Sequence, residues 1–372
     1  MPQELLDNPE VLYGAAVALV IVILLTPAVG GMARLLGVVD VPEKRRLNLN
    51  PIPRLGGLAI FFGIFVPALA FLELGRETRG VLLGAAVATT VGAIDDFRVL
   101  KPGRKLAGQV LAAAIPPFFG VWIDHFTFPF FGPVDLPALV GVPVTMLWIV
   151  AVMNMVNFLD GLDGLAAGVC GISAATYAVL ALSLGKTDPA ILSAIVAGAC
   201  LGFLRHNFFP ARIFMGDSGA LALGFLLAAV SVQGLFKTAS TIVLFLPLLV
   251  LAVPILDTSF VVARRLKHRE RLSAPDQSHL HFRFLRRGFS QRRATVTMWM
   301  WCATLAVAAL ATRFIPFRAG GVWHLWETLA AAAIALVAIG FSIYVVYLLE
   351  IVKLANPRVR RTEEAARHRR SA

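Results

Sequence analysis

The stretch NFLDGLDGLAAG, residues 157–168, puts two carboxylates, Asp160 and Asp163, between two long apolar runs of the chain. The amide of Asn157 comes just before them, and three glycines lie among and after them. A polar turn between two membrane helices would explain the glycines. Two acids in one short turn suggest instead that a basic group or a metal ion lies beside them. The composition and the other polar motifs of the chain favour this second interpretation.

The chain is far more apolar than a soluble protein of its size. Of its 372 residues, 58% are hydrophobic and 15% are charged, and the mean hydropathy is +0.78. In an average soluble domain about 25% of the residues are charged. Apolar runs of about 20 residues are long enough to cross about 30 Å of hydrocarbon. Eleven such runs lie at residues 11–32, 55–75, 79–95, 106–123, 137–157, 163–184, 189–205, 217–236, 239–263, 295–313 and 326–352. The sequence therefore predicts an all-α integral membrane protein with about eleven transmembrane helices.

The basic residues predict how these helices are oriented. With the N-terminus outside, 28 of the 34 Lys and Arg residues fall in the inside segments, which are 33–54, 96–105, 158–162, 205–216, 264–294 and 353–372. Such an excess is typical of cytoplasmic loops. We therefore predict an outside N-terminus, a cytoplasmic C-terminus, one polytopic membrane domain over 1–352 and a basic, disordered cytoplasmic tail over 353–372. The net charge of +12 then reflects topology and contact with anionic lipid, and we expect no nucleic acid as a partner.

Six acids outside the basic loops gather at one predicted face of the membrane. They are Asp95, Asp96, Asp160, Asp163, Asp217 and Asp257. An ionised carboxylate deep in a bilayer costs about 2.5–3.5 kcal/mol even on a lenient scale, so acids at the ends of spans are usually paired or functional. Each motif taken alone has a simpler explanation. The adjacent aspartates could cap a helix, Asp217 could be an N-cap, and Asp257 could pair with Arg264 or Arg265.

Together the polar motifs point to a metal-bound pyrophosphate. Lys101 and Lys105 follow the aspartate pair, and two histidines and several arginines lie in the long inside loop 264–294. Mg²⁺ prefers hard oxygen ligands and keeps several waters, so one Asp and one amide suffice when phosphates supply the rest. Lysine and arginine offset the remaining phosphate charge. We therefore expect Mg²⁺, with Mn²⁺ as a substitute, and phosphoryl transfer at the cytoplasmic face.

Six motifs, in this order along the chain, resemble those of the polyprenyl-phosphate N-acetylhexosamine-1-phosphate transferases, the superfamily of MraY, WecA and TagO. They are RLNLNPIPRLGGLAI (46–60), GAIDDFRVLKPGRKLAGQ (92–109), NMVNFLDGLDGLAAG (154–168), HNFFPARIFMGDSGA (206–220), PILDTSFVVARR (254–265) and SHLHFRFLRRGFS (278–290). The resemblance implies transfer of a sugar-1-phosphate from a UDP-sugar to polyprenyl (undecaprenyl) phosphate with release of UMP. The group expected to be transferred is GlcNAc-1-phosphate. This would be the first membrane step of a cell-envelope glycan, catalysed in the cytoplasmic membrane.

The resemblance also implies roles for individual residues. Asp95 and Asp96 match the aspartate pair at the lipid-phosphate site, and the sequence does not say which of them is the base. Asn157 and Asp217 match metal-site residues. Lys105 matches a lysine that faces phosphate.

The remaining matches concern the nucleotide and the sugar. Asp160, as a catalytic residue, and Asp163 match positions around the nucleotide. The residues expected to bind substrate are Asp163, Asn207, Arg54, Lys101, His279, His281 and Arg283. The last three lie in the one long inside loop, where we expect contacts with the sugar phosphate or the N-acetyl group.

Within the superfamily, PIPRLGG resembles the WecA/TagO branch, because MraY-like members carry a PTMGG-like version and three adjacent histidines. Asn48 and Phe282 depart from that branch, since histidines are usual at both positions. Two alternatives remain open: an MraY-like transferase that uses UDP-MurNAc-pentapeptide, and an ion-coupled transporter. A transporter should hold its acids near the middle of the bilayer. The oligomeric state also stays open, a homodimer included.

Overall fold

The computed structural model describes residues 2–40, 51–128, 132–236, 241–268, 279–316, 318–319 and 322–349. Asn48 and the predicted tail 353–372 lie outside these residues. The described part consists of helices joined by loops and by three short antiparallel β-hairpins. The elements are α1 (Pro2–Asp7), α2 (Glu10–Leu35), β1 (Val39–Asp40), β2 (Ile52–Pro53), α3 (Gly56–Phe71), α4 (Arg76–Phe97), α5 (Pro102–Phe118), β3 (His125–Phe128), β4 (Gly132–Asp135), α6 (Ala138–Leu159), α7 (Leu165–Ser183), α8 (Thr187–Asn207), α9 (Gly216–Val230), the π-helix η1 (Ser231–Phe236), α10 (Thr241–Val250), α11 (Ala252–His268), α12 (Leu280–Arg286), α13 (Gln291–Phe314), β5 (Arg318–Ala319), β6 (Val322–Trp323) and α14 (Leu325–Leu348).

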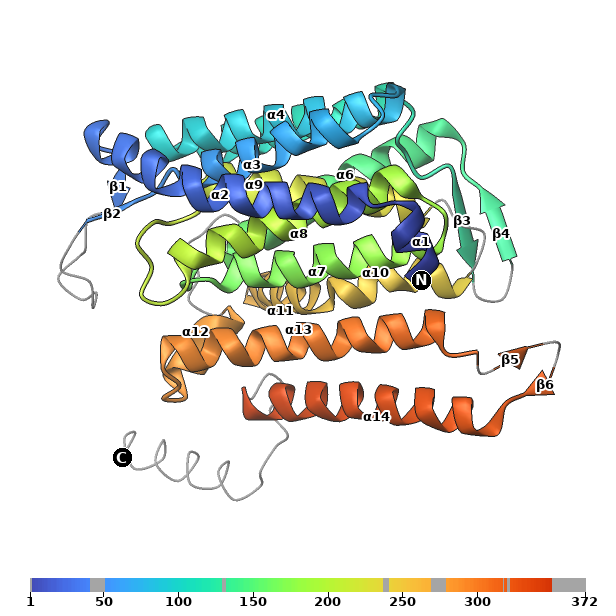
Figure 1. Cartoon of the computed structure of the whole chain (residues 1–372). Coiled ribbons are helices and arrows are strands. Elements are labelled where there is room, and N and C mark those ends of the chain that lie inside the picture. Colours follow the sequence, from blue (N-terminus) through green and yellow to red (C-terminus); the bar gives the residue numbers. More distant parts are fainter. Residues whose placement is uncertain are drawn as a thin grey trace, which may run out of the picture.

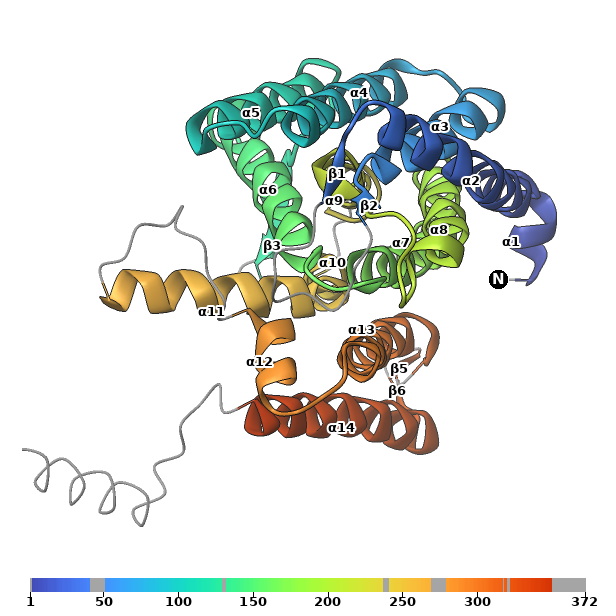
Figure 2. The same ribbon diagram turned by 90° about the vertical axis from the view of Figure 1, so that its left-hand side faces the viewer.

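Most helices run side by side along one axis, as Figure 1 shows, and Figure 2 looks along that axis. Eight helices among the described residues are long and apolar enough to cross a membrane: α2, α4, α6, α7, α8, α9 with the start of η1, α13 and α14. This confirms an all-α, multi-pass membrane protein. The number eleven is not confirmed. Two other predicted spans, 55–75 and 106–123, correspond to the shorter helices α3 and α5, of 16 and 17 residues.

The predicted span 239–263 is two helices rather than one, because α10 ends at Val250 and α11 begins at Ala252. Figure 2 shows α11 lying across the direction of the bundle and extending away from it. A polar second half explains why the segment does not cross the bundle as one helix. Asp257 is buried in α11, which ends in the basic stretch ARRLKH, and such residues are costly in hydrocarbon.

Helix α9 forms the centre of the bundle, packed against α4, α6 and α3. Every residue of α9 except Asp217 is buried. Glycines let the backbones approach closely at its first turn. A Cβ atom at Gly92 of α4 would overlap the backbone of Asp217, and one at Gly57 of α3 would overlap the backbone of Gly219. Small residues serve this purpose at helix interfaces in membranes.

A histidine joins α2 and α8 where a proline interrupts the hydrogen bonds of α2. Pro27 has no N–H, so it cannot donate to the carbonyl of Ile23 as a normal helical residue would. Nε2 of His206, from the last turn of α8, lies 3.0 Å from this carbonyl oxygen. In a membrane protein such a freed carbonyl needs a partner from a neighbouring helix. The contact therefore fixes the end of α8 that leads into the site.

Candidate active site

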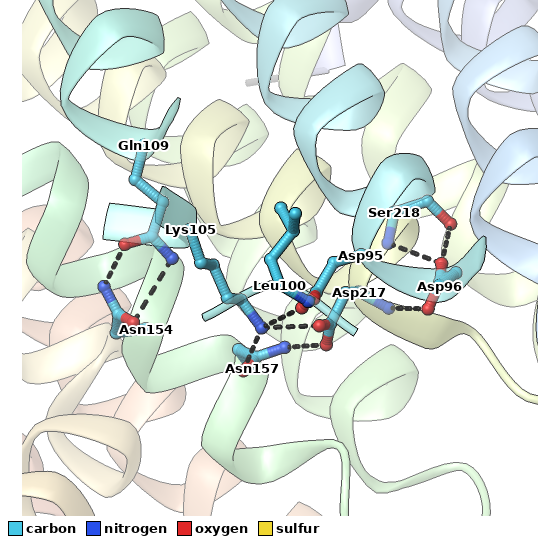
Figure 3. Close-up of polar contacts among 9 residues, drawn as sticks. All are labelled: Asp95, Asp96, Leu100, Lys105, Gln109, Asn154, Asn157, Asp217 and Ser218. Carbon is cyan, nitrogen blue, oxygen red and sulfur yellow. Dashed lines mark hydrogen bonds and ion pairs between the residues drawn. The ribbon is translucent and has the colours of Figure 1, made fainter. Parts of the chain in front are cut away.

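Four helix ends meet at one end of the bundle. Asp95 and Asp96 lie in the last turn of α4 and Asn157 in the last turn of α6. Lys105 lies in the first turn of α5 and Asp217 in the first turn of α9. The sequence directions of these helices explain the meeting, because α4 and α6 end at the face where α5 and α9 begin (Figure 3).

The Lys105 ammonium contacts oxygens from three other helices. Its Nζ lies 2.5 Å from Asp217 Oδ2, 3.0 Å from Asp95 Oδ2 and 3.3 Å from Asn157 Oδ1. Nδ2 of Asn157 donates to Asp217 Oδ1 at 2.5 Å. The side chains of Lys105 and Asp217 are 18% and 20% exposed, so the cluster is open to a ligand. Two carboxylates and an amide oxygen therefore surround one cationic group.

Asp96 differs from its neighbour Asp95 because it caps another helix. Its Oδ1 accepts a hydrogen bond from Asp217 N at 2.8 Å, and its Oδ2 accepts from Ser218 N at 3.0 Å and Ser218 Oγ at 2.8 Å. The first N–H groups of a helix have no partner within that helix and carry partial positive charge, so a carboxylate stabilises them. Gly216 has φ +70°, and a Cβ there would crowd the Asp96 oxygens. Asp96 thereby fixes the start of α9.

Asp95 holds the turn between α4 and α5. Its Oδ1 accepts a hydrogen bond from Leu100 N at 2.5 Å, and its Oδ2 faces Lys105.

The simpler explanation of Asp217 as the N-cap of its own helix is not what the structure shows. Asp96 supplies the cap, and the Asp217 carboxylate points to Lys105 and Asn157 instead.

Asp160 directly follows α6 and is half-buried near the same cluster. Burial, together with the nearby carboxylates of Asp217 and Asp96, raises the pKa of Asp160 to about 7, and the charge of Arg54 acts in the opposite direction. Arg54 directly follows β2. Pro53 O, the last carbonyl of β2, accepts a hydrogen bond at 2.8 Å from Phe214 N in the segment before α9. The loop 160–164, which contains Asp160 and Asp163, therefore lies next to these helix ends.

Asp163 and Asn207 tie two loops together. Asp163 Oδ2 accepts from Ala211 N at 2.9 Å, and Asn207 Oδ1 accepts from Gly164 N at 3.0 Å. Asn207 Nδ2 also donates to Ile213 O at 2.9 Å. Both side chains are buried, and burial raises the pKa of Asp163. The structure thus gives both residues a part in holding the loop 160–164 against the loop 208–215, and substrate contact by either stays a prediction.

His279 and His281 lie at the start of α12, on the side of the loop 160–164. His279 Nδ1 lies 2.9 Å from Asp257 Oδ2, and Leu280 N donates to Asp257 Oδ1 at 2.6 Å. Asp257, which could have paired with an arginine of its own helix, therefore binds the start of α12. His281 is buried against Gly161, and within the described part of the chain neither of its ring nitrogens has a hydrogen-bond partner. Burial lowers the pKa of His281 to about 4, so its ring is neutral at pH 7.

Other predicted substrate contacts lie further from this centre or already have partners. Arg283 Nη1 donates to Leu349 O at 3.3 Å, and its guanidinium lies 4.0 Å from the ring centre of Phe260. It therefore holds α12 against α11 and the end of α14. Lys101 is exposed at the start of α5. The ring of Phe282 packs on His281, with 4.3 Å between centroids.

Sequence reasoning missed three polar residues beside the cluster. Ser218 binds Asp96, and Gln109 of α5 pairs with Asn154 of α6 (Figure 3). A signal was present in the sequence, because Gln109 lies four residues after Lys105 and Asn154 lies three before Asn157. These spacings put each pair on one helix face.

The carboxylate and amide oxygens around Lys105 are the type of ligand that a hard divalent cation prefers. In the described part of the chain no three His, Cys, Asp or Glu side chains are grouped as a metal site. A cation here would instead take the carboxylate of Asp217 and the amide oxygen of Asn157, which lie side by side. Such a set suits Mg²⁺ when phosphate and water provide the other ligands. The carboxylates of Asp217 and Asp96 add to the effect of burial in raising the pKa of Asp160, so negative charge gathers near this site.

Comparison with known proteins identifies the family. Residues 78–235 match glycosyl transferase family 4. The chain is 38% identical over 296 residues to a probable undecaprenyl-phosphate N-acetylglucosaminyl 1-phosphate transferase of Bacillus subtilis, which covers 79% of this chain and 82% of that protein. It is 35% identical to the decaprenyl-phosphate N-acetylglucosaminephosphotransferase of Mycobacterium leprae, over 82% of this chain and 84% of that protein. A phospho-N-acetylmuramoyl-pentapeptide-transferase of Desulforudis audaxviator is 34% identical, over 81% of this chain and 97% of that protein. The chain therefore belongs to glycosyl transferase family 4, the superfamily of the polyprenyl-phosphate sugar-1-phosphate transferases.

Proposed function

We propose that this protein transfers GlcNAc-1-phosphate from UDP-GlcNAc to a polyprenyl phosphate and releases UMP. The observation that carries the proposal is the meeting of Lys105 with oxygens of Asp217, Asp95 and Asn157 at one end of a membrane bundle. The names of the relatives from Bacillus subtilis and Mycobacterium leprae support GlcNAc as the sugar. In this reaction a phosphate oxygen of the lipid bonds to the β-phosphorus of the donor, and the bridging oxygen leaves with UMP.

Mg²⁺, held by Asp217 and Asn157, would neutralise the pyrophosphate of the donor when bound. Lys105 would then exchange part of its contact with the two carboxylates for a phosphate oxygen, because an ammonium group binds phosphate as a point charge. Asp160 and Arg54 adjoin the same helix ends and would face the nucleotide. Most of the catalytic effect would come from orientation and charge neutralisation, as is general for phosphoryl transfer.

The two adjacent aspartates would have different roles. Asp95 faces Lys105 and is the candidate to accept a proton from the lipid phosphate or to orient it. Asp96 has both oxygens hydrogen-bonded to the first turn of α9, so we assign it the positioning of Asp217. In this proposal Asp95, rather than Asp96, serves as the base.

We further propose that the site faces the cytoplasm, in the cytoplasmic membrane, with the N-terminus outside. The basic residues concentrated in the predicted inside segments support this orientation. The ion-coupled transporter is less well supported, because the acids lie at helix ends rather than in the middle of the bundle. The MraY-like activity remains the second candidate, supported by the relative from Desulforudis audaxviator.

The donor assay tests the function directly. We expect the purified protein to release UMP from UDP-GlcNAc only when undecaprenyl phosphate and Mg²⁺ are present, with UDP-MurNAc-pentapeptide giving much slower release. The measurement is UMP formed per minute for each donor, with identification of the lipid product by mass spectrometry. Faster release from the pentapeptide donor would favour the MraY-like activity, and no release from any UDP-sugar would reject the transferase proposal.

Substitutions at the acidic positions separate metal binding from the role of Asp95. Asp217→Asn removes a charge that holds a hard cation, so turnover should fall roughly 10²-fold or more and recover in part at higher Mg²⁺ or with Mn²⁺. Turnover of Asp95→Asn should fall as far, but higher Mg²⁺ or Mn²⁺ should not restore it. Asp188→Asn is the matched control, because Asp188 is also an acid in the first turn of a span. It lies at the start of α8, whereas the end of α8 leads into the site. Full activity of Asp217→Asn at low Mg²⁺ would contradict the metal assignment.

The raised pKa of Asp160 predicts a pH dependence of stability. Because the pKa is about 7 in the folded protein and 3.8 in a free side chain, the folded state binds the proton more tightly. Ionisation of Asp160 therefore destabilises the fold progressively as pH rises from about 4 to about 7. Asp160→Asn should raise the Tm of the metal-free protein more at pH 8 than at pH 5, and Mg²⁺ should reduce that gain. An equal gain at both pH values would reject the assignment.

Two exposed glycines test the orientation in the membrane. Gly75 precedes α4 and Gly103 lies at the start of α5, and a Cβ at either position meets nothing within 4 Å. The native cysteines are all buried, so they should label slowly. An impermeant thiol reagent should label Gly75→Cys from outside and Gly103→Cys only from inside, in oriented membrane vesicles. Labelling of both from the same side would contradict the predicted topology.

A further inference from the structure

Gln109 of α5 and Asn154 of α6 form a reciprocal pair of amide hydrogen bonds. Asn154 Nδ2 donates to Gln109 Oε1 at 2.9 Å, and Gln109 Nε2 donates to Asn154 Oδ1 at 3.3 Å. Gln109 is 1% exposed. Asn154 Nδ2 also donates to the Val150 carbonyl of its own helix at 2.8 Å, which fixes the orientation of the amide.

This pair lies one helical turn further into the bundle than the contact between Lys105 and Asn157. Lys105 and Gln109 are four residues apart on α5, and Asn154 and Asn157 are three apart on α6, so each pair shares a helix face. Figure 3 shows the two contacts next to each other, with Asp217 bound to the outer one. Two successive polar contacts therefore join α5 to α6 at the site.

Helix α5 needs such a contact because much of its surface faces outward. The large apolar side chains exposed on it are Leu106, Val110, Leu111 and Phe118. Lipid gives no hydrophobic driving force between helices, so packing and interhelical hydrogen bonds hold them together, and apolar contacts alone define less well how far one helix is shifted along another. Directional hydrogen bonds do specify it. The amide pair is thus a contact that can set the register of α5 against α6, while α4 packs on another side of α5.

We propose that Gln109 and Asn154 are positioning residues of the active site, which hold the Lys105 ammonium within reach of both Asn157 and Asp217. The inference rests on the proposed function, because it names residues that serve the same site. It predicts that the pair affects turnover through the register of α5 and not through the stability of the fold.

The experiment compares single and double substitutions of similar shape. Gln109→Met leaves the buried Asn154 oxygen without its partner and should lower the Tm, whereas Gln109→Met with Asn154→Leu removes both polar partners and should restore the Tm. A shift of about 1 Å at a catalytic group can cost as much as 10²-fold in rate. We therefore expect kcat for UMP release in the double variant to stay about 10-fold or more below that of the unaltered protein. Unchanged kcat in this stable double variant would overturn the inference.

A conservative exchange provides the rescue. Gln109→Asn and Asn154→Gln each change the length of one amide side chain and should lower kcat, but together they conserve the summed length and should restore much of it. Ser342→Ala is the control, because Ser342 accepts a comparable hydrogen bond from Trp301 Nε1 at 2.8 Å between α13 and α14. It should lower the Tm without lowering kcat. A double exchange no more active than either single variant would count against the pairing.

A distance measurement reads the register without any assay of activity. Spin labels at Leu111→Cys of α5 and Leu147→Cys of α6 would be exposed, and the native cysteines are buried. The distance distribution should broaden or shift in the Gln109→Met and Asn154→Leu double variant. An unchanged distribution would reject the positioning role. A changed distribution in a protein that releases no UMP from any UDP-sugar would instead reject the proposed function and leave the register inference intact.

Discussion

The capping of α9 by Asp96 is the contact on which the rest of the site depends. A helix that starts inside a membrane bundle has four N–H groups without internal partners. Here a carboxylate from α4 accepts hydrogen bonds from two of them, the N–H groups of Asp217 and Ser218, so the acid that anchors the helix and the acid that points to Lys105 belong to different helices. The cap fixes where α9 begins, and the position of Asp217 follows from it. Lys105 and Asn157 then meet Asp217 because their own helices end or begin at the same face.

The carboxylates of the site are arranged around one cationic group. Asp95 and Asp217 share the Lys105 ammonium, and Asp160 and Asp96 add further negative charge nearby. Repulsion among these groups would open the helix ends if no cation lay between them. Lysine supplies that cation in the structure, and it can give way to a better one because its stem is flexible. The same arrangement therefore holds the helix ends together, and in the proposed reaction a metal-bound phosphate would take over part of the lysine's contacts.

Much of this could be predicted from the sequence, and the reasons are physical. The helical membrane fold follows from the length of the apolar runs, and the gathering of Asp95, Asn157 and Asp217 follows from the alternating direction of successive helices. The different roles of Asp95 and Asp96 could not be predicted, because both are adjacent acids and only the neighbouring helix distinguishes them. The break between α10 and α11 was also missed, since the apolar run continues through Leu251. The loop contacts of Asp163 and Asn207 depend on tertiary partners that no local pattern reveals.

The glycine contacts around α9 have a consequence for how the protein moves. Packed helices usually adjust by sliding over one another on a layer of side chains. Between α3, α4 and α9 that layer is missing at Gly57, Gly92 and Gly219, where backbone lies on backbone. We therefore expect these three helices to move as one rigid unit, in which Asp96 keeps its hydrogen bonds to the start of α9. Adjustment around two large substrates is then left to elements outside that unit, such as α11 and α12, which pack on α6 and α13 instead.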